Sequence, residues 1–176
     1  MAGAPSLREQ LGRECLHGHP KLCPCGSSLR YTACCGRFHR GLEEAPDAPA
    51  LMRSRYAAYA VRDVAYLWRT LHPSHPDRAR PEAEVTRELR AAVSQFHYTG
   101  LRVLDWRAPD AEGRAQVLFL ARLFRAGKEH SFLEASDFLH DGVGWRYVGG
   151  EPVALASVRG DPEQLTLQTL PTLVVR

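Results

Sequence analysis

Four cysteines near the N-terminus have the types and spacing of metal ligands. The set forms the pattern C-x-C-x8-C-C within thirteen residues and consists of Cys23, Cys25, Cys34 and Cys35. Thiolates bind zinc in a tetrahedron with Zn–S bonds of about 2.3 Å, so the chain has to fold back between the two pairs. Because four thiolates leave no position for water, the pattern predicts a structural Zn²⁺ ion rather than a catalytic one.

The residues between and after the cysteines suit such a turn. Pro24 fixes the backbone between the first two ligands, and Gly26 with Ser27 supplies the first turn. We expect Gly36, directly after the last ligand, to adopt a positive φ.

Two other interpretations of the cysteines are open. Cys34 and Cys35 would be unrelated buried thiols, or a vicinal disulfide in redox chemistry, but neither explains the second pair at this distance. Five cysteines in a chain without an apolar export signal are expected to be reduced ligands in the cytoplasm. The fifth, Cys15, is expected to be a free thiol that competes only weakly for metal.

The bulk composition describes a soluble globular chain. It has 176 residues, 44% of them hydrophobic, and its 23 basic and 20 acidic residues give a net charge of +3, which is too weak to argue for nucleic acid. The longest apolar run, residues 117–121, is far shorter than a membrane span of roughly 20 residues. We therefore expect a cytoplasmic protein with no membrane partner.

Helical periodicity precedes strand periodicity along the chain. Apolar residues recur every three or four positions over 51–71, where Asp63 either bends one helix or caps a second. A further helix is predicted from Pro81, with Val85 and Leu89 on its buried face. Period-two segments follow at 101–106, 115–125, 129–140 and 145–148, separated by glycine-containing turns. The class is α+β: helices followed by a curved antiparallel sheet of four strands.

These elements predict five regions. They are a flexible N-terminal arm (1–22), a zinc knuckle (23–40), a linker (41–50), the α+β domain (51–150) and a C-terminal extension (151–176). Two apolar stretches of the extension, 153–158 and 165–175, are expected either to add edge strands or, for the second, to cover a partner surface.

The cysteine segment resembles the SEC-C motif, which binds zinc and mediates protein contacts at the end of the bacterial translocase motor SecA. The motif often has Gly where this chain has Ser28. Residues 51–59, 62–63, 66–67, 70–73 and 145–148 resemble the bacterial YchJ-like family over roughly 23–150. That resemblance implies a cone-shaped domain similar to nuclear transport factor two. The family's usual His-Glu-x-Ser-Arg-Phe is here Leu-Glu-Ala-Ser-Asp-Phe (133–138), so no role of the replaced His and Arg transfers.

Cone folds of this type can enclose a ligand cavity. By alternation His130, Phe132, Glu134, Ser136 and Phe138 share one face. The candidate cavity residues are Tyr56, Trp68, Arg122, Glu134, Ser136, Phe138 and Trp145. The favoured alternative is structural: Glu134 forms an ion pair with Arg122 or Arg55, Ser136 satisfies a backbone group, and the aromatic residues are core. No catalytic residue is assigned, and catalysis is not expected.

Three functions compete. The first, which is the function that we predict, is a protein-interaction module whose knuckle docks a partner through Arg30, Tyr31, Arg37, Phe38, His39 and Arg40. The second is a small-molecule binder or acid–base enzyme that uses the cone cavity, which an open pocket containing Glu134 with Arg122 would favour. The third, ranked below protein binding, is nucleic-acid binding through an exposed Tyr31 and Phe38 with the basic residues around the metal.

Overall fold

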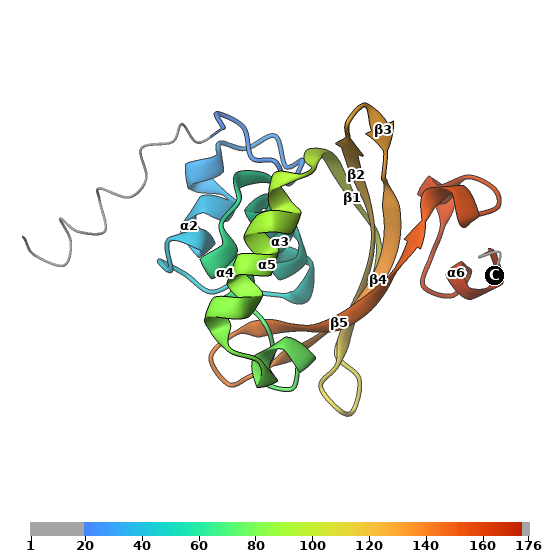
Figure 1. Ribbon diagram of the computed structural model, residues 1–176. Helices are drawn as coiled ribbons and strands as arrows, with labels where there is room; N and C mark the ends of the chain where they lie inside the picture. Colours follow the sequence, from blue (N-terminus) through green and yellow to red (C-terminus); the bar gives the residue numbers. More distant parts are fainter. Residues whose placement is uncertain (1–19, 174–176) are drawn as a thin grey trace, which may run out of the picture.

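A curved antiparallel sheet wraps around a group of helices, which lie against its concave face (Figure 1). The computed structural model describes residues 20–173; most of the predicted flexible arm, with Cys15, lies outside the described residues. The helical elements are η1 (Tyr31–Ala33), α2 (Cys35–His39), α3 (Ala48–Val61), α4 (Val64–Arg69), η2 (Pro76–Ala79), α5 (Glu82–Ser94), η3 (Leu155–Ser157), η4 (Pro162–Gln164) and α6 (Leu170–Leu173).

The sheet has the predicted antiparallel order and is not closed into a barrel. Its strands are β1 (His97–Arg107), β2 (Ala115–Arg125), β3 (Lys128–Glu129), β4 (Phe132–His140) and β5 (Trp145–Ala154), in the order β1-β2-β4-β5 with β3 paired to β2. The predicted strand over 129–140 is divided, because residues 130–131 leave the ladder between β3 and β4. Extra residues in the registers of β1 and β5 are of the kind that bend a sheet.

The segment with helical periodicity over 51–71 forms two separate helices. Arg62 has a φ of 63°, which ends α3, and the Asp63 side chain accepts a hydrogen bond from the Tyr66 N–H at 3.0 Å to cap α4. The two-helix alternative is thus correct. At the other end, Asp47 accepts from the Ala50 N–H at 2.7 Å, so α3 begins at Ala48, inside the segment predicted to be a linker.

The main core lies between α3, α4 and the concave face. Its members include Leu51, Leu67, Val93, Val117 and Phe138, all at most 2% exposed. Burial of this apolar surface is the main force that holds the helices on the sheet.

The later part of the C-terminal extension, with Leu165 and Leu170, covers the convex face of the sheet (Figure 1). Leu165 and Leu170 pack there against Leu118, Leu120 and Leu133. Of the two stretches expected to form edge strands, the first only prolongs β5 as far as Ala154, and the second forms no strand within residues 165–173. This part of the extension buries apolar surface of its own chain.

None of the helices within residues 20–173 has both the length and the apolar composition that crossing a membrane requires.

Candidate functional site

The four predicted ligand cysteines come together at one point. Their Sγ atoms all lie within 4.8 Å of one another, with 3.6 Å between Cys25 and Cys34 and 4.0 Å between Cys34 and Cys35. A tetrahedron with Zn–S bonds of about 2.3 Å has sulfur–sulfur edges of roughly 3.8 Å. The cluster therefore fits a tetrahedral divalent cation.

The loop between the pairs is held by backbone geometry. The Cys23 N–H donates to the Leu29 carbonyl at 2.8 Å, and Gly26 has a φ of 78°. Ser28, at the position where SEC-C motifs often have Gly, also has a positive φ of 59°. Gly36 does not adopt the positive φ that we expected; it lies inside α2, where a Cβ atom would come within 2.7 Å of the Tyr31 carbonyl oxygen. Glycine is needed at position 36 because the backbone of Tyr31 packs too closely for a side chain.

The clustered thiols shift one another's pKa. A hydrogen bond with Cys25 raises the pKa of Cys23 to about 11. Hydrogen bonds with Cys23 and Cys25 also raise the pKa of Cys35, whereas a hydrogen bond with Cys23 lowers the pKa of Cys25. Four adjacent thiolates repel one another, so a bound cation that favours the deprotonated form would remove this conflict.

The knuckle is fastened to the domain by the aromatic residues predicted to contact a partner. Tyr31, Phe38 and His39 are 3%, 5% and 7% exposed. The ring of His39 bridges two elements: Nδ1 lies 2.7 Å from the Tyr31 hydroxyl oxygen, and Nε2 lies 2.8 Å from the Ser54 carbonyl oxygen in α3. The expectation of an exposed Tyr31 and Phe38 is therefore wrong.

The three arginines of the same predicted set are more accessible. Arg30 and Arg40 are exposed, and the half-buried Arg37 pairs with Glu43 at 3.2 Å. They remain candidates for contact with a partner.

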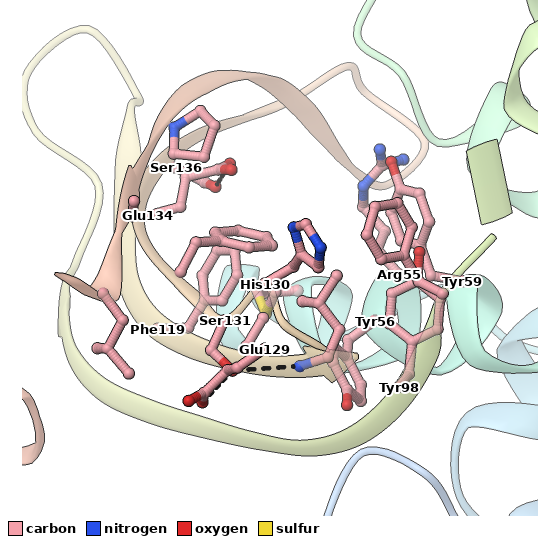
Figure 2. A pocket seen from close by; sticks show the side chains of 18 of the residues that line it. Arg55, Tyr56, Tyr59, Tyr98, Phe119, Glu129, His130, Ser131, Glu134 and Ser136 are labelled. Carbon is pink, nitrogen blue, oxygen red and sulfur yellow. Dashed lines mark hydrogen bonds between the residues drawn. The ribbon is translucent and has the colours of Figure 1, made fainter. Parts of the chain in front are cut away.

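A cavity of about 930 Å³ lies between the concave face of the sheet and α3 (Figure 2). Its wall includes buried residues such as Met52, Ser136 and Phe138, whereas Glu129, Pro152, Ala154 and Ala156 are exposed. The exposed residues mark the mouth. The rest of the wall is largely aromatic, and its rings belong to Tyr56, Tyr59, Phe96, Tyr98, Phe119, Phe132, Phe138 and Tyr147.

The structure brings only part of the predicted cavity set together. Tyr56, Glu134, Ser136 and Phe138 line the cavity, and Trp68, Arg122 and Trp145 do not.

The three misplaced residues have other partners. Trp68 packs with Val85 and lies beneath the Arg78 guanidinium. Trp145 meets His140 edge to face, with 5.6 Å between ring centroids. Arg122 pairs with Glu163 at 3.0 Å, because its neighbours Ala121 and Leu123 point into the cavity and alternation turns it outward.

Glu134 is buried without a counter-ion. It is 8% exposed, and its Oε1 accepts hydrogen bonds from the Ser136 hydroxyl at 2.5 Å and from the Tyr147 hydroxyl at 3.1 Å. Within residues 20–173 it forms no ion pair, so the expected pairing with Arg122 or Arg55 is wrong. Ser136 likewise serves this carboxylate rather than a backbone group.

Arg55 lines the same cavity. Its Nη1 donates to the Leu67 carbonyl at 2.9 Å and to the Thr70 hydroxyl at 2.6 Å, and its Cζ lies 4.5 Å from the centre of the Tyr147 ring. Burial raises the pKa of Tyr147, and the charge of Glu134 raises it further, so the phenol stays protonated as a donor.

Comparison with known proteins shows which family the chain belongs to. A family model described as YchJ, middle NTF2-like domain, matches residues 47–150. The UPF0225 protein YchJ of Shigella dysenteriae serotype 1 (strain Sd197) is 38% identical over 130 residues, which cover 74% of this chain and 82% of that protein. The chain belongs to the YchJ-like family.

Two solved structures are similar to this YchJ-like chain. A SEC-C motif containing protein from Rhodopseudomonas palustris, solved in solution, aligns with a TM-score of 0.64 and 36% identity over 75% of this chain and 98% of its own. A SEC-C motif containing protein from Psychrobacter arcticus, solved by crystallography, aligns with a TM-score of 0.63 and 22% identity over 73% of this chain and 81% of its own. The second similarity concerns the fold alone.

The departures from the YchJ-like strand pattern lie outside the cavity. Leu133 packs beneath the C-terminal extension, and Asp137 accepts hydrogen bonds from Arg114 at 2.8 Å and Gln116 at 2.9 Å. The residues that match the pattern, Glu134, Ser136 and Phe138, are those that line the cavity.

Proposed function

We propose that this protein binds a small organic molecule in the cavity of its cone-shaped domain and uses its four-cysteine site as a structural zinc centre. The observation that supports the proposal is a cavity of about 930 Å³ that contains the buried carboxylate of Glu134, which forms no ion pair within residues 20–173. Pockets of this size with apolar walls and few polar groups are typical of sites for small ligands. A carboxylate buried without a counter-ion is costly unless a ligand or solvent compensates it.

The positions of the polar groups in the cavity favour ligand binding over acid–base catalysis. Glu134 and His130 both line the cavity, but they are four residues apart on one extended segment. Their Cα atoms are therefore separated by roughly 13 Å, since an extended chain rises about 3.3 Å per residue. A general acid and base that act on the same atom need to lie within hydrogen-bond reach of it.

The proposed zinc ion stabilises the knuckle. Cys23, Cys25, Cys34 and Cys35 would hold it, and the cross-link would fix a segment that has little core of its own. The proposal places the protein in the cytoplasm, where thiols stay reduced and available to metal.

Ligand binding is testable by blocking the mouth of the cavity. The variant Ala156→Trp places a large ring at an exposed lining position, and Ala111→Trp places the same ring on an exposed turn outside the lining. A small-molecule library is screened against the full chain by ligand-observed NMR. We expect ligands that bind the wild type and Ala111→Trp but not Ala156→Trp. Equal binding to both variants, or no ligand in the library, would contradict the proposal.

Protein docking on the knuckle is a second candidate, supported by apolar side chains on its surface. Leu22 and Leu29 are 61% and 55% exposed, close to the exposed Arg30. The two leucines with the arginines replace the buried aromatic residues as the proposed contact surface. Nucleic-acid binding is not proposed, because Tyr31 and Phe38 are not available to stack on bases.

A pull-down from the source organism tests this second candidate. We expect a partner captured by the wild type and lost with Leu29→Ser, while Val143→Ser, at a 72% exposed position on a distant turn, retains it. A partner retained by Leu29→Ser would contradict docking on this surface.

A further inference from the structure

Two side chains of opposite charge line the cavity without pairing with each other. Glu134 lies on β4 and Arg55 on α3, and Figure 2 shows them on opposite sides of the cavity. Both are buried, at 8% and 6% exposure. No ion pair joins either of them to any residue between 20 and 173. Each therefore keeps its charge available to a ligand.

One oxygen of Glu134 is free to accept a hydrogen bond. Both donors, the Ser136 and Tyr147 hydroxyls, use Oε1, and a Cβ atom at Gly150 would lie 2.5 Å from the same oxygen. Oε2 has no donor among the described residues. Among the described residues, Nε of Arg37 is the one side-chain nitrogen or oxygen atom that is fully enclosed without a hydrogen-bond partner. Since Oε2 of Glu134 also has no partner, it is not fully enclosed and is open to the cavity.

Arg55 has free donors by the same reasoning. Toward the part of the chain that the structure describes, only its Nη1 donates, to the Leu67 carbonyl and the Thr70 hydroxyl, and these bonds anchor the guanidinium to α4. Nη2 and Nε have no acceptor within the described chain and are not fully enclosed. They remain available for a carboxylate, which a guanidinium binds with two parallel hydrogen bonds.

Tyr147 sets the separation of the two charges. Its hydroxyl oxygen lies 3.1 Å from Oε1 of Glu134, and its ring centre lies 4.5 Å from Cζ of Arg55. The two charged groups thus contact the same tyrosine side chain, Glu134 at its hydroxyl and Arg55 over its ring. This spacing leaves room for a short group with a cationic and an anionic end.

We propose that the cavity binds a zwitterion, an α-amino acid or close derivative with an aromatic or large aliphatic side chain. Its ammonium group donates to Oε2 of Glu134, its carboxylate accepts from Nη2 and Nε of Arg55, and its side chain packs on the aromatic wall. This assignment rests on the proposed function, since it names the ligand class of the same cavity.

A ligand with one charge fits less well. An organic cation would pair with Glu134 and leave Arg55 without a counter-ion, and an organic anion would do the reverse. A buried charge that loses water without gaining a partner is strongly unfavourable. The zwitterion satisfies both groups, and the rings of Tyr56, Tyr59 and Tyr98 supply the apolar contact for its side chain.

The probes for the test are L-tryptophan, L-phenylalanine and L-leucine, each in four forms. The free amino acid carries both charges, the methyl ester only the cation, the N-acetyl amino acid only the anion, and the N-acetyl methyl ester neither. Affinities for the full-length protein are measured by calorimetry. We expect at least one free amino acid to bind about tenfold more tightly than its three derivatives, as one charge-assisted contact is worth about that factor.

Two variants locate the contact. Glu134→Gln keeps an acceptor for Ser136 and Tyr147 but removes the charge, and Glu151→Gln removes a charge from an exposed position of β5 outside the cavity. We expect Glu134→Gln, checked for folding by circular dichroism, to lose the preference for the free amino acid over the N-acetyl form. Glu151→Gln should keep it.

Several outcomes would overturn the assignment. They are tighter binding of a methyl ester or an N-acetyl form, equal binding of all four forms, or no binding of any. None of these outcomes removes library ligands that Ala156→Trp blocks, so the proposed function would survive the failure of this assignment. Failure of the library screen would remove both.

Discussion

Gly150 on β5 lies directly against the carboxylate of Glu134 on β4. A Cβ atom at position 150 would come within 2.5 Å of Oε1 and within 2.9 Å of Cδ and Cγ. The φ of Gly150 is not in the left-handed region. Glycine is therefore needed at this position because there is no space for a side chain, and not for its backbone conformation. The carboxylate keeps its position in the cavity because this strand offers no side chain at that point.

The substitution Gly150→Ala is therefore expected to displace Glu134. The clash should lower the free energy of unfolding by about 1–3 kcal/mol, as overpacking does, and weaken binding of any cavity ligand. Gly149→Ala is the matched control, since a Cβ atom there meets nothing within 4 Å. Urea denaturation and ligand titration measure both effects. Equal stability of the two variants would contradict the prediction.

Removal of one cysteine ligand should release the metal. We expect about one zinc per wild-type chain by elemental analysis, as in four-thiolate structural sites, and a large loss with Cys34→Ser. Hydrogen exchange should then rise over 23–40, because the knuckle loses its cross-link, and change less in the sheet. Cys15→Ser removes the one cysteine that is not among the four predicted ligands and serves as the control. Equal zinc content in the two variants would be inconsistent with the site.

The features that the sequence predicted well are local. The cysteine pattern implies its own convergence, and Asp63 is a capping residue wherever a helix follows it. Alternation placed His130, Glu134, Ser136 and Phe138 on one face of the strand, which is the face that lines the cavity.

The features that it missed depend on contacts distant in the chain. Tyr98 and Tyr147 reach the cavity from β1 and β5, and no pattern within either strand marks one face as concave. The burial of His39 follows from its contact with Ser54, fifteen residues away, in another helix. The chemistry of Arg122 suits a cavity that contains a carboxylate, but Arg122 lies between the inward-facing Ala121 and Leu123, so alternation points it outward.

The hydrogen bond between Tyr31 and His39 is expected to stabilise the attachment of the knuckle. Tyr31→Phe removes a buried hydroxyl 2.7 Å from Nδ1 of His39 and should cost about 1–2 kcal/mol of unfolding free energy. Tyr59→Phe removes a hydroxyl for which the described residues provide no hydrogen bond, and it should cost less than about 0.5 kcal/mol. Denaturation curves of the two variants at one pH compare them. A larger loss with Tyr59→Phe would refute this role.

Stability at acidic pH is expected to depend on His75. Burial lowers its pKa below the ordinary value of 6.5; the Arg55 charge acts in the same direction, and Asp77, with Oδ2 at 3.9 Å, opposes them. The unfolded chain therefore takes up this proton at a higher pH than the folded chain. As the pH falls through 6.5, the free energy of unfolding decreases.

The variant His75→Asn isolates this contribution. Its side chain keeps an acceptor for the Asp77 N–H, which lies 3.1 Å from Nδ1 of His75, but it does not titrate. Unfolding free energies are measured for both proteins at a series of pH values between about 8 and 5, which spans the ordinary range of histidine titration. The wild type should lose stability relative to His75→Asn below pH 6.5, because of the two side chains at position 75 only the histidine takes up a proton on unfolding. Parallel curves, or a relative gain by the wild type at low pH, would show that burial does not hold this imidazole neutral.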